Sequence, residues 1–105
     1  MNAKQKSEIR FRHVNHLCDK VIKHLEPSHA LVLLVGWRHA DVRSVFRLSE
    51  SRISECTGIS TRHVRNIIHA LVKAGALVIV EPGIGTRATQ YRITGEPKDD
   101  TKKSS

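Results

Sequence analysis

The chain has 105 residues, and 39% of them are hydrophobic, which suits one small domain of only marginal intrinsic stability. Lys and Arg number 18 against 10 Asp and Glu, a formal net charge of +8 that favours a polyanionic partner, usually nucleic acid, although a merely soluble basic surface would give the same balance. The longest apolar run, residues 30–35, is far too short to cross a bilayer.

Residues 7–26 have a helical pattern and follow a largely polar stretch, residues 1–6, that we expect to be frayed. Apolar side chains recur at steps of three and four residues and predict one buried stripe, formed by Phe11, Val14, Cys18, Val21, Ile22 and Leu25. Pro27 is expected to end this helix, and Ser28 to cap the next one. We therefore treat residues 1–27 as an N-terminal amphipathic helix outside the main domain.

Residues 28–40 predict a second helix. Its segment 30–35 is apolar on every side, which indicates burial between two layers; a lone strand would also give this run, but the Pro-Ser start and the length to Trp37 favour a helix. Residues 44–48 alternate between apolar and polar and predict a short strand.

Two helices separated by a glycine follow. Ser49 is a good cap for a helix over residues 50–57, and Gly58 can end it in the left-handed conformation. Ser60 caps a restart that runs to Ala74 and stops at Gly75.

The last ordered part is a hairpin. Residues 76–81 and 88–94 predict two strands joined by residues 82–87, whose glycines suit a mobile tip. Residues 95–105 contain no apolar side chain, so we expect a disordered polar tail. The fold class is therefore mainly α with a small β-hairpin (α+β).

The order helix, helix, strand, helix, glycine turn, helix, hairpin resembles the winged helix-turn-helix family over about residues 28–94. The resemblance implies a winged domain with an extra N-terminal amphipathic helix, most similar to prokaryotic transcription regulators and to plasmid or phage replication initiators. Ser54 departs from the pattern, since the family usually has alanine there, but it is small. The residues that carry the resemblance are Ile53, Ser54, Gly58, Ile59, Val64 and Ile67.

The helix over residues 60–74 has one apolar side, which must face the core; it consists of Val64, Ile67, Ile68, Leu71 and Val72. In the family the opposite side reads the major groove, where Arg can bind guanine and Asn adenine through two bonds. The first residues of the helix also attract phosphate. The candidate residues are Ser60, Thr61, Arg62, Arg65, Asn66 and His69. An ordinary solvated face, or a face for protein contact, remains the alternative.

The hairpin tip is the second candidate surface. The resemblance implies a wing on the DNA backbone or in the minor groove, with Arg87 as its main contact and Thr86 and Arg92 as helpers; an ordinary hairpin with a solubilising arginine is the alternative. Arg43 and Arg52 either touch flanking phosphates or are plain surface charge.

Neither a metal site nor an active site is expected. His13, His16 and Cys18 are close in sequence, but His13 and Cys18 face different sides of a helix and no second cluster completes a tetrahedral set. The glycine-rich residues 82–88 lack the Gly-Lys-Ser/Thr ending of a phosphate loop. We therefore expect a protein without enzymatic activity or cofactor.

The compartment is predicted from the cysteines and the N-terminus. Cys18 and Cys56 form no CxxC motif and are interpreted as reduced, core-filling residues, while Arg10, Arg12 and His13 interrupt the first apolar cluster, so no signal peptide is visible. These features predict a cytoplasmic, nucleoid-associated protein.

Together these patterns predict a sequence-specific binder of double-stranded DNA, either a transcriptional regulator or a partition or replication accessory of a mobile element. A homodimer through residues 1–27 is favoured, because dimers that read two half-sites are frequent in this architecture; packing of this helix on its own domain is the alternative. A winged domain that docks onto a partner protein is the rival function.

Overall fold

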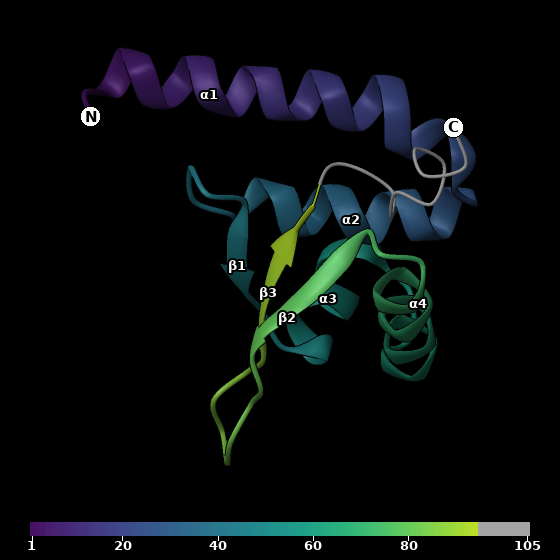
Figure 1. Cartoon of the computed structure of the whole chain (residues 1–105). Coiled ribbons are helices and arrows are strands. Elements are labelled where there is room, and N and C mark those ends of the chain that lie inside the picture. The colour runs from purple at the N-terminus through teal and green to yellow at the C-terminus, as the bar shows by residue number, and fades with distance from the viewer. Residues whose placement is uncertain (95–105) are drawn as a thin grey trace.

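Helix α1 (Ala3–His16) opens the chain in the computed structural model, which describes residues 1–94 (Figure 1). The Asn2 side chain accepts a hydrogen bond from the N–H of Gln5 (2.8 Å), and the Gln5 side chain accepts one from the N–H of Asn2 (3.0 Å). This reciprocal cap satisfies two N–H groups that the first turn leaves without partners. The expectation that the first six residues are frayed is therefore wrong.

The predicted apolar stripe is confirmed in its second half, where Val21 is buried and Ile22 and Leu25 pack against the core, but not at Phe11 and Cys18. Leu17 and Val21 are buried, whereas Phe11 is 67% exposed. Arg10 and His13, together with Leu17, turn toward the domain and contact it largely through hydrogen bonds. A π-helical turn (Leu17–Val21) and a 3₁₀ turn (Ile22–His24) then break the regular 3.6-residue period on which the stripe depended.

Both cysteines are exposed, so their interpretation as core-filling residues is wrong. Cys18 directly follows the buried Leu17 and therefore faces away from the core. Cys56 lies on α3 (Glu50–Thr57), a helix whose buried contribution is Ile53. A free cysteine is small enough for either environment, and here the larger side chains of Leu17 and Ile53 fill the core instead.

Helix α2 (Pro27–Arg38) lies between α1 and the other helices (Figure 1). Pro27 begins this helix rather than ending the previous one, as expected of a residue whose missing N–H needs no partner in a first turn. The Ser28 hydroxyl contacts the His29 ring (3.3 Å) instead of capping. The prediction of a buried helix is confirmed on one side, by Ala30, Val32, Leu33 and Gly36, while Leu31 is exposed.

The three strands form one antiparallel sheet in the order β1-β3-β2. They are β1 (Val45–Arg47), β2 (Leu77–Glu81) and β3 (Gln90–Ile93). Phe46 and Tyr91 face each other across β1 and β3, with ring centroids 5.5 Å apart. The isolated strand and the hairpin of the prediction therefore belong to a single sheet. The predicted tail, residues 95–105, lies outside the described residues.

Helices α3 and α4 (Thr61–Lys73) begin and end where their local signals predict. The Ser49 hydroxyl accepts the N–H of Arg52 (3.1 Å), and the Ser60 hydroxyl accepts the N–H of His63 (3.2 Å). Gly58 ends α3 with φ 77°, a conformation that costs glycine little. These contacts confirm the predicted break and restart of the helix.

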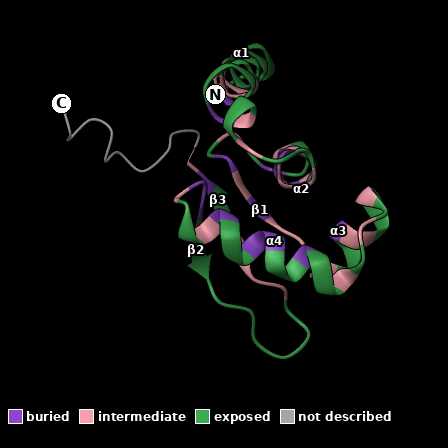
Figure 2. Cartoon of the chain, turned by 90° about the vertical axis from the view of Figure 1, so that its right-hand side faces the viewer, coloured by how far each residue is buried: buried purple, intermediate pink, exposed green. Residues whose placement is uncertain are grey.

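The core joins all of these elements. Fully buried aliphatic side chains from α2, α3, α4 and β2 meet there, and Leu17 and Val21 of the N-terminal segment belong to the same cluster. In Figure 2, α4 is buried along the side that faces the sheet and exposed along the other. The described chain is thus an α+β domain with four α-helices, and none of these helices has the length and hydrophobicity needed to span a bilayer.

Candidate functional site

The turn between α3 and α4 is held by side-chain hydrogen bonds. The Ser54 hydroxyl donates to the carbonyl of Ile59 (2.6 Å), and the Thr57 hydroxyl accepts the N–H of Ile59 (3.1 Å). The N–H of Gly58 closes the end of α3 on the carbonyl of Ser54 (2.8 Å). The serine at position 54 therefore satisfies a backbone carbonyl that alanine would leave to water. The result is a fixed angle between the two helices.

Helix α4 has the burial pattern that its sequence predicts. Val64, Ile67, Ile68 and Leu71 are at most 3% exposed, which turns the polar candidates outward. Arg62 is exposed and has no ion-pair partner among residues 1–94. Residues 56–80 contain no Asp or Glu, so α4 carries only positive formal charge. The exposed candidates on its outer surface are Arg62, Arg65, Asn66 and His69.

Arg65 is paired with Glu50 at the start of α3. Two guanidinium nitrogens lie 2.9 and 3.0 Å from the Glu50 Oε1, and the Arg65 side chain stays 52% exposed. The hydrogen bond to Glu50 and its negative charge raise the pKa of Arg65. The pair fixes the direction of the guanidinium, and an incoming anion must share Arg65 with Glu50. Sequence reasoning missed this partner, because 15 positions separate the two residues.

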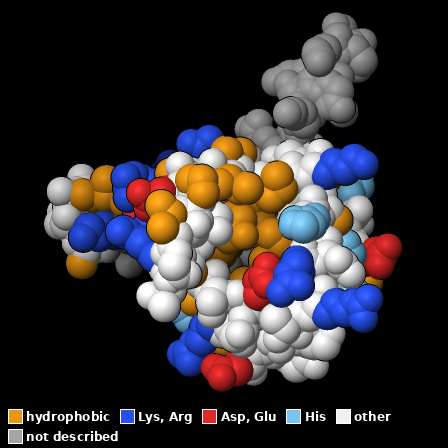
Figure 3. Space-filling view, turned by 90° about the horizontal axis from the view of Figure 1, so that it is seen from below, with side chains coloured by type: hydrophobic (Ala, Val, Ile, Leu, Met, Phe, Trp, Pro, Cys, Tyr) orange, Lys and Arg blue, Asp and Glu red, His pale blue; other side chains and the backbone are white. Residues whose placement is uncertain are grey.

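An open groove of about 410 Å³ lies between the start of α4 and the loop over residues 82–89. Predicted residues from both segments line it: Thr61 and Arg65 from α4, Thr86 and Arg87 from the loop. Figure 3 shows this end of the molecule, with hydrophobic side chains near the centre and Lys and Arg toward the edge. A second groove beside it is lined by His69 and Ile79. The structure therefore brings four of the nine residues of the two predicted surfaces together in one concave region.

The loop is tied to the sheet through Glu81. The Glu81 carboxylate accepts a hydrogen bond from Arg47 of β1 and lies 3.8 Å from the Arg87 guanidinium. The hydrogen bond from Arg47, followed by the charges of Arg87 and Arg47, lowers the pKa of Glu81. Reciprocal backbone bonds between Ile84 and Arg87 (3.2 and 2.9 Å) close the tip. Arg87 thus stands at a defined turn, with its side chain 66% exposed.

The remaining candidates lie elsewhere. Arg92 sits within β3, opposite Val45 and Val78, so the strand register separates it from the loop with which it was grouped. Arg92 and Arg43 line a different cavity, under α1. Arg52, on α3, lies 3.4 Å from Glu55.

Arg43 is occupied by Asp41, which takes its guanidinium at 2.8 Å. Burial raises the pKa of Asp41. Hydrogen bonds from the Arg43 side chain and from the N–H groups of Val45 and Arg43 lower it by more in total, so the pKa lies below its ordinary value. This pair keeps Arg43 beside its own loop.

The described residues show no group of three or more His, Cys, Asp and Glu side chains that could hold a metal ion. Comparison of the chain with family models, with curated proteins and with solved structures gives no match. The inference of function therefore depends on the geometry of this surface.

Proposed function

We propose that the chain is a winged helix-turn-helix protein whose helix α4 and β2–β3 loop bind double-stranded DNA. The observation that carries the proposal is the groove lined by Thr61, Arg65, Thr86 and Arg87, with Arg62 exposed beside it on α4. Side chains from two segments far apart in sequence converge there, and each can bind phosphate or a base edge.

In this proposal α4 enters the major groove. An α-helix with its side chains is about 10–12 Å across, close to the width of that groove. Arg62 and Asn66 lie one turn apart on the exposed side, where they can bind guanine and adenine through two bonds each. The hydroxyl of Thr61 and the partial positive charge at the start of α4 suit a phosphate. Arg87 then reaches the adjacent backbone or the minor groove.

The two carboxylates of this surface set the cost of binding. Glu50 and Glu81 hold Arg65 and Arg87 in the free protein. A DNA phosphate must therefore replace or share these contacts, and only Arg62 is available without competition among the three arginines. The two close contacts to Glu50 also fix the Arg65 guanidinium, which reduces the side-chain entropy that this residue loses on binding.

The biological role that we propose is transcriptional regulation, or partition or replication of a mobile element, without enzymatic activity and without a cofactor. A homodimer that reads two half-sites fits this role. The described N-terminal segment packs on its own domain through Leu17 and Val21, and its outer side, including Phe11, stays available to a second copy.

The test compares two double variants that remove the same charge. Fluorescence anisotropy with a labelled random-sequence duplex measures affinity at several salt concentrations. Arg62→Gln/Arg65→Gln should lose at least tenfold in affinity, since both arginines would contact phosphates of any duplex and their loss removes two neutralising charges from the interface. Lys20→Gln/Arg38→Gln, at exposed positions of the N-terminal segment and α2, should lose much less. Affinity of the wild type should fall steeply with salt as counterions are released.

Equal losses in the two double variants would mean that DNA affinity depends only on the net charge of the protein, and α4 would then not be the binding surface. Absence of binding at low salt would remove the proposed function itself.

A second function, docking onto a partner protein, is favoured by strand β2. It is an edge strand of the sheet, since within residues 1–94 its side away from β3 has no neighbouring strand. Val78, Ile79 and Val80 on it are 38–48% exposed, which is unusual for three consecutive apolar residues. Such an edge can accept an added strand. Association through this surface should change little with salt, in contrast to DNA binding.

A further inference from the structure

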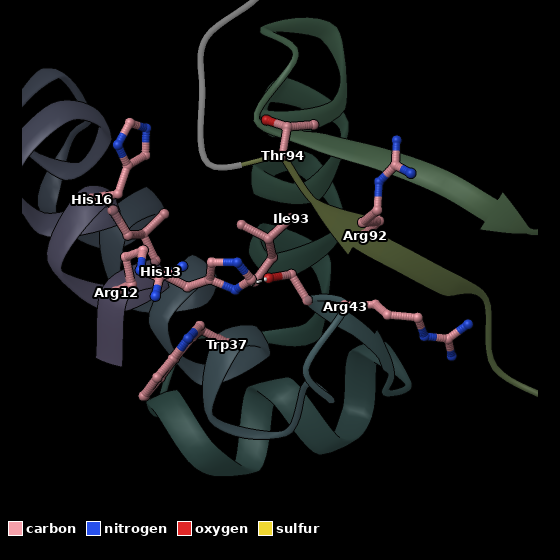
Figure 4. A pocket seen from close by; sticks show the side chains of 10 residues that line it. Arg12, His13, His16, Trp37, Arg43, Arg92, Ile93 and Thr94 are labelled. Carbon is pink, nitrogen blue, oxygen red and sulfur yellow. Dashed lines mark hydrogen bonds between the residues drawn. The ribbon is translucent and has the colours of Figure 1, made fainter. Parts of the chain in front are cut away.

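A cavity of about 490 Å³ lies under α1, at the opposite end of the sheet from the β2–β3 loop (Figures 1 and 4). Its lining comes from α1, α2, the loop before β1 and the end of β3. The volume lies within the range of about 300–1,000 Å³ that is usual for small-molecule sites.

The formally charged side chains of the lining are all arginines: Arg12 of α1, Arg43 before β1 and Arg92 of β3. His13 and His16 of α1 also line the cavity, and no Asp or Glu does. In Figure 4 the Arg43 and Arg92 side chains extend away from Arg12 and His13. Arg43 is held by Asp41, but neither Arg12 nor Arg92 has an ion-pair partner among residues 1–94. Arg12 therefore offers an anion a guanidinium that no carboxylate of the described chain occupies.

Two further observations indicate that the polar groups are arranged for a ligand. Ser44 is the one non-glycine residue of the described chain with a positive φ, 63°, and its buried hydroxyl lies 2.8 Å from the His13 Nδ1. Such a backbone conformation is costly for serine and clusters at functional sites. The Nε2 atom of His16 is buried and has no hydrogen-bond partner among the described residues. A buried nitrogen of this kind normally has a partner.

The rest of the lining is apolar. Leu17 and Ile93 are almost fully buried, and both line the cavity together with Trp37. An aromatic ring next to cationic groups suits a ligand with both an anionic end and an apolar body. We propose that this cavity binds a small organic anion, a carboxylate or phosphate monoester with an aromatic or aliphatic group. The site does not depend on DNA binding by α4.

The carboxylate has two possible sources. One is a free small molecule. The other is the chain itself, because residues 95–105 follow Thr94 at the edge of the cavity and contain Glu96, Asp99 and Asp100. Both sources present the same chemistry to Arg12 and Arg92, and the experiment below separates them.

Trp37 is the only tryptophan of the protein and lines this cavity, so its fluorescence reports on the cavity and on the Arg10 guanidinium that lies over its ring. The full chain is titrated with benzoate, with phenyl phosphate and with the neutral benzamide. We expect a saturable change in Trp37 emission with the two anions and at least a tenfold weaker response to benzamide. Arg12→Gln should weaken anion binding at least tenfold, whereas Arg38→Gln, an equal loss of charge next to Trp37 but outside the lining, should leave it within twofold.

The variant Glu96→Gln/Asp99→Asn/Asp100→Asn identifies the source. Tighter binding of benzoate to this variant than to the wild type would show that the chain's own carboxylates compete for the site; unchanged binding would assign the site to a free anion. Three results would overturn the proposal: equal responses to benzoate and benzamide, equal losses in Arg12→Gln and Arg38→Gln, or no saturable response in either the wild type or the triple variant.

Discussion

The two ends of the molecule hold their arginines in different ways. At the end formed by α3, α4 and the β2–β3 loop, Arg65, Arg87 and Arg52 each lie within 4 Å of a glutamate. Under α1, Arg12 and Arg92 have no such partner in the described chain. An ion pair orders a guanidinium but lowers the net charge that a ligand meets. In the two proposals, an anion at the first end must compete with glutamates for Arg65 and Arg87, whereas Arg12 under α1 has no competing carboxylate in the described chain.

The same two ends also differ in how their helices are attached. Helix α4 buries four aliphatic side chains in the core, whereas α1 has no buried residue of its own and docks through Arg10 and His13. Hydrophobic burial is worth more than a few hydrogen bonds that compete with water. The end that carries the proposed DNA surface is therefore the more rigid one, and α1 is the element that can separate from the domain at the lower cost.

The strongest test of this difference is Ile67→Ala. Ile67 is 1% exposed and belongs to the main core cluster, so we expect a loss of about 2–5 kcal/mol in the free energy of unfolding, measured by urea denaturation. Asn66→Ala, one residue away on the exposed side, is the control and should change stability by at most about 0.5 kcal/mol. Similar values for both variants would contradict the orientation of α4.

Arg10→Ala should have a smaller and local effect. The Arg10 guanidinium donates to the carbonyls of Ala40 and Trp37 and lies 4.4 Å from the centre of the Trp37 ring. Loss of these contacts should weaken the docking of α1 by about 1–2 kcal/mol. Hydrogen exchange should accelerate in residues 3–16 and stay unchanged in α4. Lys20→Ala, at an exposed position, is the matched control. Faster exchange in both helices would mean that α1 does not separate independently.

The difference between α4 and α1 also explains which parts of the fold the sequence could predict. The ends of α3 and α4 depend on residues inside or next to each helix, such as Ser49, Gly58 and Ser60, so the sequence alone predicted them. The docking of α1 depends on bonds between residues about 30 positions apart and on a π-helical turn. Neither has a local signal, so the apolar stripe predicted the docking of Val21, Ile22 and Leu25 but not that of residues 3–16.

The candidate site divides in a similar way. The exposed side of α4 could be predicted because burial of Val64, Ile67 and Leu71 leaves the opposite side to solvent. The pairing of Arg65 with Glu50 could not, since it depends on the angle between two helices. The position of Arg92 could not be predicted for another reason. Strand register decides where along the sheet a residue lies, and the length of the loop does not reveal the register.

Glu50→Gln tests the role of the ion pairs by removing a carboxylate instead of an arginine. The pair with Arg65 is half exposed, so its loss should cost less than about 1 kcal/mol of stability in thermal or urea unfolding. In the proposed function the freed Arg65 should raise DNA affinity a few-fold at low salt. Glu55→Gln removes the same charge from a partner of Arg52, farther from the groove, and should raise affinity less. Weaker DNA binding by Glu50→Gln would mean that Glu50 orients Arg65 for its target.

The smallest effect concerns Glu81 and appears on acidification. Hydrogen bonding from Arg47 and the nearby Arg87 charge lower the pKa of Glu81 from its ordinary value of 4.5. The folded state therefore holds this proton less tightly than the unfolded state, so the contribution of Glu81 to stability is present above pH 4.5 and is lost as pH falls through the lower, folded value. We expect a titration of the Glu81 carboxyl carbon by NMR to have its midpoint below 4.5.

Two variants identify the cause of that shift and connect it to the β2–β3 loop. Arg47→Gln should raise the midpoint of Glu81 more than Arg87→Gln does, because the hydrogen bond from Arg47 is the largest cause of the lowered pKa. Both shifts should shrink in high salt, since the carboxylate is exposed. A larger shift in Arg87→Gln would mean that the tip arginine is the main partner of Glu81. In that case the loop end, like Arg65, would release its guanidinium only by exchange with a competing anion.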